Sequence, residues 1–239
     1  KSGEKYVGQW GSNVLNGKGR REYSENSTWL YYEGEHKNDK REGFGKMEYK
    51  DGTSWEGTWK ADSRVEGQGT VRYDNGFIYT GALMDGKRNG FGKGVDKNGR
   101  IYEGTWKDNK WDGTGKVIYE EGNNWLSYEG EVKEDKITGK GIITYSGSSQ
   151  MSTYEGELLE SKRHGHGILH WENGARFEGE WENDSWEGKG RIDYEATNDW
   201  CYFDGEYKKD LRDGYGEVQY RNGESWKGIW KEGSRFEGE

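Results

Sequence analysis

The chain has 239 residues, of which 34% are charged and 29% are hydrophobic, and its formal net charge is −9. This balance is typical of disordered chains, but 15% of the residues are aromatic and 13 are tryptophans, which indicates a chain that folds around rings. The negative charge argues against nucleic-acid binding and against simple attraction to anionic lipid, because both need a basic surface.

The cysteine content, the apolar runs and the first residues limit the class of protein further. Cys201 is the single cysteine, so no intrachain disulfide forms, which fits a reducing compartment. No apolar run approaches the roughly 20 residues that span a bilayer, and the first residues do not read as a signal peptide. The chain begins with Lys1 and not with Met, which is compatible with a fragment of a longer protein.

One phrase recurs along the chain: an aromatic residue, any residue, then glycine. Its glycine returns every 23 to 26 residues, which is the signature of a repeat array. In chain order, these glycines are Gly8, Gly34, Gly57, Gly81, Gly104, Gly130, Gly156, Gly179, Gly205 and Gly228. A Gly-x-Gly pair follows each of the first nine. We therefore expect residues 1–239 to form one array of about nine full repeats and a truncated tenth.

Each repeat predicts two β-strands. In the repeat of Gly104, the first strand places Tyr102 and Trp106 on one face, and the second places residues 113, 115, 117 and 119 on the same face. The opposite face takes Glu103, Thr105 and their equivalents, which are mostly polar, often Glu on the first strand and Lys or Arg on the second. Opposite charges on facing strands give modest support to a sheet.

The turns between repeats agree with antiparallel hairpins. Asn-Gly or Asp-Gly follows the second strand in five repeats, as at Asn98-Gly99 and Asn173-Gly174. We expect both residues of each such pair to have positive φ. No segment has a helical period, so the predicted fold is all-β, a ladder of antiparallel hairpins.

The glycines have a packing reason in such a ladder. A ring on one strand can lie flat over a glycine of the neighbouring strand, where a Cβ would block it. The aromatic–glycine grid is therefore expected to be a folding device first.

The sequence resembles the MORN (membrane occupation and recognition nexus) repeat family, whose motif is close to Tyr-x-Gly-x-Trp followed, after several polar residues, by Gly-x-Gly. Residues 79–92, 102–115 and 154–167 match it nearly position for position. The resemblance implies an elongated, curved, single-layer antiparallel sheet of stacked hairpins. It also implies scaffolding, partner binding or phospholipid binding.

Some repeats depart from the motif. The tryptophan position holds another residue in five repeats: His36, Leu83, Val132, Leu158 and Tyr207. Four repeats are three residues longer. They insert Trp29, Trp125, Met151 or Trp200 just before the aromatic-x-Gly phrase. We expect these side chains to pack their own longer hairpin, the alternative being a raised lip along the sheet.

The sequence shows no group of residues that is typical of a catalytic site. The carboxylates fall on the polar face in uniform surroundings, whereas acid–base pairs need contrasting ones. His166 and His170 would lie about 13 Å apart on a strand, too far to share one ion. We therefore expect no enzyme activity, no cofactor and no metal.

Three functions stay open. The leading one is a scaffold or adaptor that binds a protein helix, an extended segment or a second copy of itself, because an unpaired aromatic face marks an interaction site. The second is a phospholipid-binding module, and the third is the targeting region of a larger enzyme. A secreted glycan-binding repeat fits the spacing less well. The resemblance alone suggests a cytoplasmic, cytoskeletal or ciliary location.

The predicted contact surface is a groove on the aromatic face. Its residues are the rings at the motif positions: Tyr79, Tyr102, Trp106, Tyr128, Tyr154, Phe177, Trp181, Phe203 and Tyr207. Glu103, Glu129, Glu155 and Glu178 are expected on the opposite, non-binding face.

Overall fold

The computed structural model describes residues 3–147 and 149–239, and in these residues every regular element is a β-strand. The contacts divide the chain into two compact units, Lys1–Gly113 and Thr114–Glu239, each considered by itself. The all-β prediction is confirmed. Whether the whole chain is one array stays a prediction.

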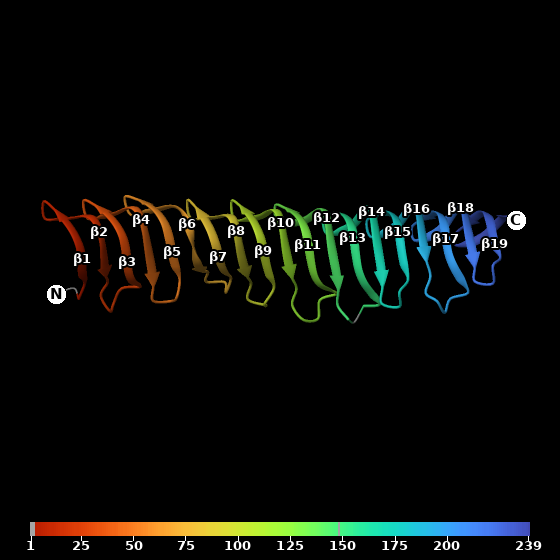
Figure 1. Ribbon diagram of the computed structural model, residues 1–239, viewed down its shortest axis with the longest axis horizontal. Helices are drawn as coiled ribbons and strands as arrows, with labels where there is room; N and C mark the ends of the chain where they lie inside the picture. Colours follow the sequence, from red (N-terminus) through yellow and green to blue (C-terminus); the bar gives the residue numbers. More distant parts are fainter. Residues whose placement is uncertain (1–2, 148) are drawn as a thin grey trace. The chain divides into compact units, whose positions relative to one another are not determined.

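In the first unit, consecutive strands pair antiparallel and lie side by side in one layer (Figure 1). The strands are β1 (Lys5–Gly11), β2 (Val14–Glu22), β3 (Trp29–Lys37), β4 (Lys40–Tyr49), β5 (Ser54–Lys60), β6 (Ser63–Arg72), β7 (Ile78–Met84), β8 (Lys87–Val95) and β9 (Ile101–Lys107). The boundary between the units falls inside β10 (Lys110–Ile118).

The second unit has the same arrangement, with each strand paired to the next (Figure 1). Its further strands are β11 (Trp125–Lys133), β12 (Lys136–Tyr145), β13 (Met151–Leu159), β14 (Lys162–Trp171), β15 (Arg176–Glu182), β16 (Ser185–Asp193), β17 (Trp200–Lys208), β18 (Leu211–Tyr220), β19 (Ser225–Lys231) and β20 (Ser234–Gly238).

A line of glycines crosses the strands of each unit. In the second unit, Gly141 pairs with Gly130 on one side and with Gly156 on the other, and Gly167 continues the line. The ring of Tyr154 lies against two of these glycines: a Cβ on Gly156 would come within 2.6 Å of the Tyr154 hydroxyl, and one on Gly167 would overlap the ring. The predicted packing of rings on glycines is confirmed.

The first glycine of each Gly-x-Gly pair has a separate role. Between Gly156 and Leu158 of β13 there is one residue, whereas three residues lie between their partners Gly167 and Arg163 of β14. This is a β-bulge, and Gly165 within it has a φ of 58°. The Tyr154 hydroxyl donates a 2.9 Å hydrogen bond to the Glu157 carbonyl, the residue that faces the bulge.

The prediction for the Asn-Gly turns is wrong. Only the glycine of each pair has positive φ: Gly99 does (93°) and Asn98 does not. The hydrogen bonds between Asp96 and Arg100 and from the Gly99 N–H to the Asp96 carbonyl close a longer loop with a glycine bulge.

The two-residue turns with both φ values positive occur at the opposite ends of the strands, within each repeat. They are built mostly from polar residues other than glycine, such as Asn183 (51°) and Asp184 (73°). Asn and Asp tolerate this conformation better than most residues.

These tight turns also bond to the repeat before them. The Asp184 N–H donates to the Arg163 carbonyl, and the Arg163 N–H donates to the Asp184 carboxylate, both at 3.0 Å. Asn109 accepts from the Arg88 N–H in the same way at 2.9 Å. A side-chain acceptor at this position therefore joins successive hairpins.

We expect Gly167→Ala to lower the free energy of unfolding by about 1–3 kcal/mol, because the new methyl group overlaps the Tyr154 ring while the backbone conformation itself is permitted. Gly147→Ala is the matched control, since nothing lies within 4 Å of its added Cβ. Thermal unfolding followed by circular dichroism measures both. Equal melting temperatures for Gly167→Ala and the unmodified chain would contradict the packing account.

Substitutions of Asp184 test the turn contact. Asp184→Asn should change stability little, because Asn109 holds the same place in its own turn. Asp184→Ala should cost about 1–2 kcal/mol, because it removes the acceptor for the Arg163 N–H and places alanine at positive φ. Urea unfolding gives both values. An equal loss for the two variants would contradict this account, because it would show that a carboxamide oxygen does not replace the carboxylate as the acceptor.

Candidate protein-binding surface

In each unit, the rings predicted to line a groove lie on one face of the sheet, here called the ring face. Their side chains are 0–4% exposed. Tyr79, Tyr102 and Trp106 belong to the first unit, and Tyr128, Tyr154, Phe177, Trp181, Phe203 and Tyr207 to the second. The rings therefore form the core and offer a partner almost no surface of their own. Their part in partner binding stays a prediction.

Edge-to-face contacts between rings account for much of this burial. Trp181 packs against both Tyr154 (5.4 Å between centroids) and Phe177 (5.3 Å), and its indole N–H donates a 3.2 Å hydrogen bond to the Gly167 carbonyl. Trp106 makes the equivalent contacts with Tyr79 and Tyr102 and donates to the Gly92 carbonyl. These tryptophans therefore couple adjacent repeats through the core.

Arginines cover the rings from the solvent side. The Arg163 guanidinium lies 4.2 Å from the centre of the Trp181 ring and forms an ion pair with Asp184 at 3.1 Å. Arg212 lies between Trp200 and Trp230, at 4.5 and 4.9 Å. Such cation–π contacts let a charged side chain close an aromatic core.

The inserted tryptophans pack on their own hairpins, and Trp200 also contacts Trp230 of the next repeat at 5.9 Å. Trp125 meets Tyr119 edge-to-face at 5.8 Å, and Trp200 meets Tyr194 at 5.7 Å. Met151 lies against the Arg163 guanidinium, with its sulfur 3.9 Å from Nη1.

The opposite face of the sheet, here called the charged face, carries Glu, Lys and Arg in the predicted alternation. Arg20 and Glu33, on neighbouring strands, are 3.1 Å apart, and Lys116 and Glu129 are 3.5 Å apart. These pairs are solvent-exposed and contribute little individually. They leave no continuous basic strip on this face.

Aromatic residues also stand exposed on the charged face, which the sequence reasoning missed. Phe44, Phe91 and Tyr215 are 57%, 63% and 57% exposed, and each lies between the two glycines of a Gly-x-Gly pair. The signal was present as Gly-Phe-Gly and Gly-Tyr-Gly. Because side chains alternate along a strand, the residue just before the second, ring-face glycine must point to the other face.

Two connected depressions lie on the charged face of the first unit. One, of about 610 Å³, has a floor of Gly8, Gly19, Gly34 and Gly45, and side chains on either side of these glycines form its walls. The other, of about 590 Å³, continues it over β5 to β8, and both share Phe44 and Glu56 as lining residues. We call the pair the glycine trough.

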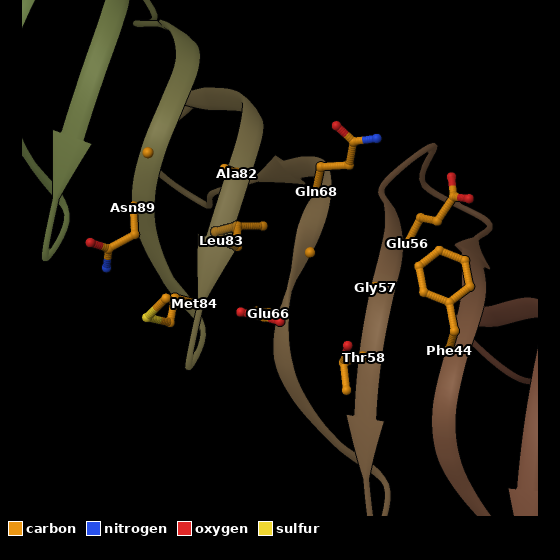
Figure 2. Close-up of a pocket in the computed structure, with 12 residues that line it drawn as sticks. Phe44, Glu56, Gly57, Thr58, Glu66, Gln68, Ala82, Leu83, Met84 and Asn89 are labelled. Atoms are coloured by element: carbon orange, nitrogen blue, oxygen red, sulfur yellow. The ribbon is translucent and has the colours of Figure 1, made fainter.

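Figure 2 shows the second depression. Phe44 of β4 lies on one side of it, and Met84 and Asn89 of β7 and β8 lie on the other. Thr58, Gln68 and Ala82 add small or uncharged side chains between them (Figure 2), so this stretch is less charged than the rest of the face.

The hairpin beneath this stretch departs from the regular register. Gly57 of β5 pairs with Gly67, the first glycine of its pair, whereas Gly8, Gly34 and Gly81 of the same unit pair with the second. In the second unit, Gly228 pairs with Gly238 in the same way as Gly57 does with Gly67. A slip of two residues keeps each side chain on its face. Trp55 replaces the usual Tyr or Phe here, is fully buried, and its indole nitrogen has no hydrogen-bond partner.

A separate cavity of about 310 Å³ opens on the ring face near the start of the chain. Arg21, Tyr23, Trp29, Arg41, Asp39, Asp62 and His36 line it. His36 takes the motif's tryptophan position, is 4% exposed, and its Nδ1 atom has no hydrogen-bond partner. Burial lowers the pKa of His36, and the nearby Arg21 and Arg41 act in the same direction.

The described residues contain no group of three His, Cys, Asp or Glu side chains placed to hold a metal ion. His166 lies 3.8 Å from Glu178 across neighbouring strands, as an exposed pair. Within the same residues, no helix is long and apolar enough to cross a membrane.

The MORN repeat sequence pattern matches eight segments: residues 6–28, 32–54, 79–99, 102–124, 128–150, 154–176, 177–195 and 203–225. The chain belongs to the MORN repeat family. The matched segments pass over residues 55–78, where Trp55 and the slipped hairpin lie.

No curated protein matches the sequence. Among solved structures, the chain is similar to the TCP domain of SAS-4 (dCPAP) of Drosophila melanogaster, solved in complex with a proline-rich motif of Ana2 (dSTIL). That similarity has 17% identity and a TM-score of 0.23, and it covers 68% of this chain and 78% of the other.

His36 predicts a pH dependence of stability. Its folded pKa is lowered, so between about pH 6.5 and that lower value the unfolded chain binds a proton that the folded chain does not. Stability should therefore fall as the pH drops below about 6.5, by at most about 1.4 kcal/mol per pH unit from this group.

The control is His36→Trp, which restores the motif residue. Because exposed carboxylates contribute to both proteins, the measured quantity is the difference between their unfolding free energies from pH 7.5 to 5. A difference that does not change with pH would contradict the assignment to His36.

Proposed function

We propose that this protein is a non-enzymatic scaffold that binds a segment of a partner protein in the glycine trough of its first unit. The observation that carries the proposal is Phe44, an exposed ring at the junction of the two depressions. Exposed aromatic residues beside a depression are the usual anchors of protein interfaces.

The choice of face follows from burial. On the ring face, a partner would have to displace arginines that already pack on rings and pair with Asp62 or Asp184. On the charged face, the trough is open and has a backbone floor. This proposal moves the contact surface from the face expected from sequence to the opposite one.

The charge pattern favours a protein over a phospholipid surface. Basic side chains on the charged face alternate with acidic ones, and several form ion pairs with them, such as Arg20 with Glu33 and Arg191 with Asp193. Attraction to anionic lipid needs several uncompensated basic residues together. The targeting of a larger enzyme remains a role that a segment-binding scaffold would also serve, and a cytoskeletal or ciliary location would follow from the family resemblance.

The test uses a displayed library of random 12-residue peptides selected on the whole chain. We expect selected peptides to lose about tenfold or more in affinity with Phe44→Ala, as measured by fluorescence anisotropy, because the ring anchors the segment. Tyr215→Ala is the matched control, since Tyr215 holds the same repeat position with the same exposure in the other unit.

Selected peptides that bind Phe44→Ala as well as the unmodified chain, but lose affinity with Arg163→Gln or Arg212→Gln, would return the site to the ring face. Circular dichroism must first show that each variant is folded. Vesicles containing phosphoinositides that bind at physiological salt, alongside a failed peptide selection, would favour the lipid alternative.

A further inference from the structure

We propose that the occupant of the glycine trough is a polyproline II segment that lies across the strands, with the residue at every third position turned toward the trough. This inference rests on the proposed function and specifies the conformation and composition of the partner. Four properties of the trough lead to it: its width, its floor, its period and the residues along its walls.

The width of the trough excludes a helix. Its walls are residues that flank a glycine on one strand, such as Glu33 and Glu35 on either side of Gly34. Alternate residues on a strand are about 6.8 Å apart. An α-helix with its side chains is about 10–12 Å across. A single extended chain fits between such walls, and a helix does not.

The floor of the trough excludes β-strand addition. The glycines that form it are paired on both sides, as Gly45 is with Gly34 and Gly57. Their backbone groups point along the sheet and are used in the ladder, so they offer no row of free donors and acceptors. A polyproline II chain needs no such row, because it forms no backbone hydrogen bonds of its own.

The period of the sheet matches that of polyproline II. Wall residues of the same kind recur every second strand, as Arg20 and Lys46 do on β2 and β4, which is about 9.6 Å. Three residues of polyproline II advance about 9.3 Å. A β-strand repeats the side chains on one face about every 6.8 Å, which does not match the spacing of the wall residues.

Exposed apolar side chains stand along the trough. Phe44 of β4 and Met84 of β7 both line it, and they are 57% and 48% exposed. Proline rings packing on aromatic side chains is a recurrent mode of recognition for this conformation.

The charges along the trough set the direction of the segment. Over β1 to β4 the walls carry three basic residues, Lys18, Arg20 and Lys46, and two acidic ones, Glu33 and Glu35. Over β5 and β6 they carry Glu56 and Glu66, which form no ion pair in the described residues. A segment with a basic residue near its middle or far end is therefore favoured. The trough runs from β1 to β8, about 34 Å, which corresponds to about eleven residues at 3.1 Å each.

The experiment compares four 12-residue synthetic peptides on the whole chain by fluorescence anisotropy. The first has proline at positions 1, 4, 7 and 10 and arginine at position 8. The second has the same composition with the prolines grouped off this period. The third replaces proline by alanine. The fourth is an amphipathic helix former of equal charge.

We expect the first peptide to bind at least about tenfold more tightly than the other three. Phe44→Ala should remove most of that preference, while Tyr215→Ala leaves it unchanged. Glu56→Gln should weaken the first peptide only modestly, because the contact is exposed to solvent.

The outcomes separate this inference from the proposed function. If the helix-forming or alanine peptide binds best and does so through Phe44, the trough is a protein site but the polyproline inference is wrong. If peptides selected from the random library bind through Phe44 but lack proline at every third position, the same conclusion holds. If no peptide of either set depends on Phe44, both proposals fail.

Discussion

The structure depends on one contact, the packing of a ring against a pair of glycines on neighbouring strands. A Cβ on either glycine would occupy the space of the ring, as at Gly156 and Gly167 beneath Tyr154. The tyrosine hydroxyl donates to the Glu157 carbonyl opposite the bulge. The ring, the glycine pair and the bulge therefore form one packing motif. Because burial removes the phenol from water, it raises the pKa of Tyr79, which makes the same contact, to about 12. A chain with so few aliphatic residues can have a core because each repeat contains this packing motif.

The core in turn decides which face is free. Tryptophans wedge between successive rings, and arginines such as Arg163 lie over them and bond to the next turn, so the ring face is closed by side chains that belong to the chain itself. The charged face has no such cover. The glycines therefore serve two surfaces: on one they admit the rings, and on the other they leave a backbone floor between two rows of side chains. A surface depression is thus a direct consequence of the way the core is packed.

Sequence periodicity was sufficient for the strands, the faces and the pairing of rings with glycines, because each depends on contacts within one repeat or between neighbours. It failed for the turns, because Asn98-Gly99 and Asn183-Asp184 are both acceptable as turn pairs, and only the number of residues between the last ladder pairs decides which has two positive φ values. It failed for the burial of the nine rings, because the reach of the Arg163 side chain over Trp181 is a property of the assembled sheet. Phe44 stands between two glycines in the sequence, and the alternation of side chains along a strand is enough to place it on the charged face.

The least regular repeat lies beside the candidate site, and there is a physical reason for this association. Identical repeats present identical surfaces, and a partner could then bind in many registers with equal affinity. Trp55 and the two-residue slip of β5 against β6 make one place in the first unit different from the others. Gly57 and Gly67 lie side by side in the floor there, Glu66 belongs to the lining, and Phe44 and Met84 stand at its sides. In the described residues, the buried indole nitrogen of Trp55 has no hydrogen-bond partner, which costs stability, because a buried donor without a partner is destabilising. An array that tolerates such a cost at one repeat gains a position that a bound segment can recognise, which the regular repeats cannot supply.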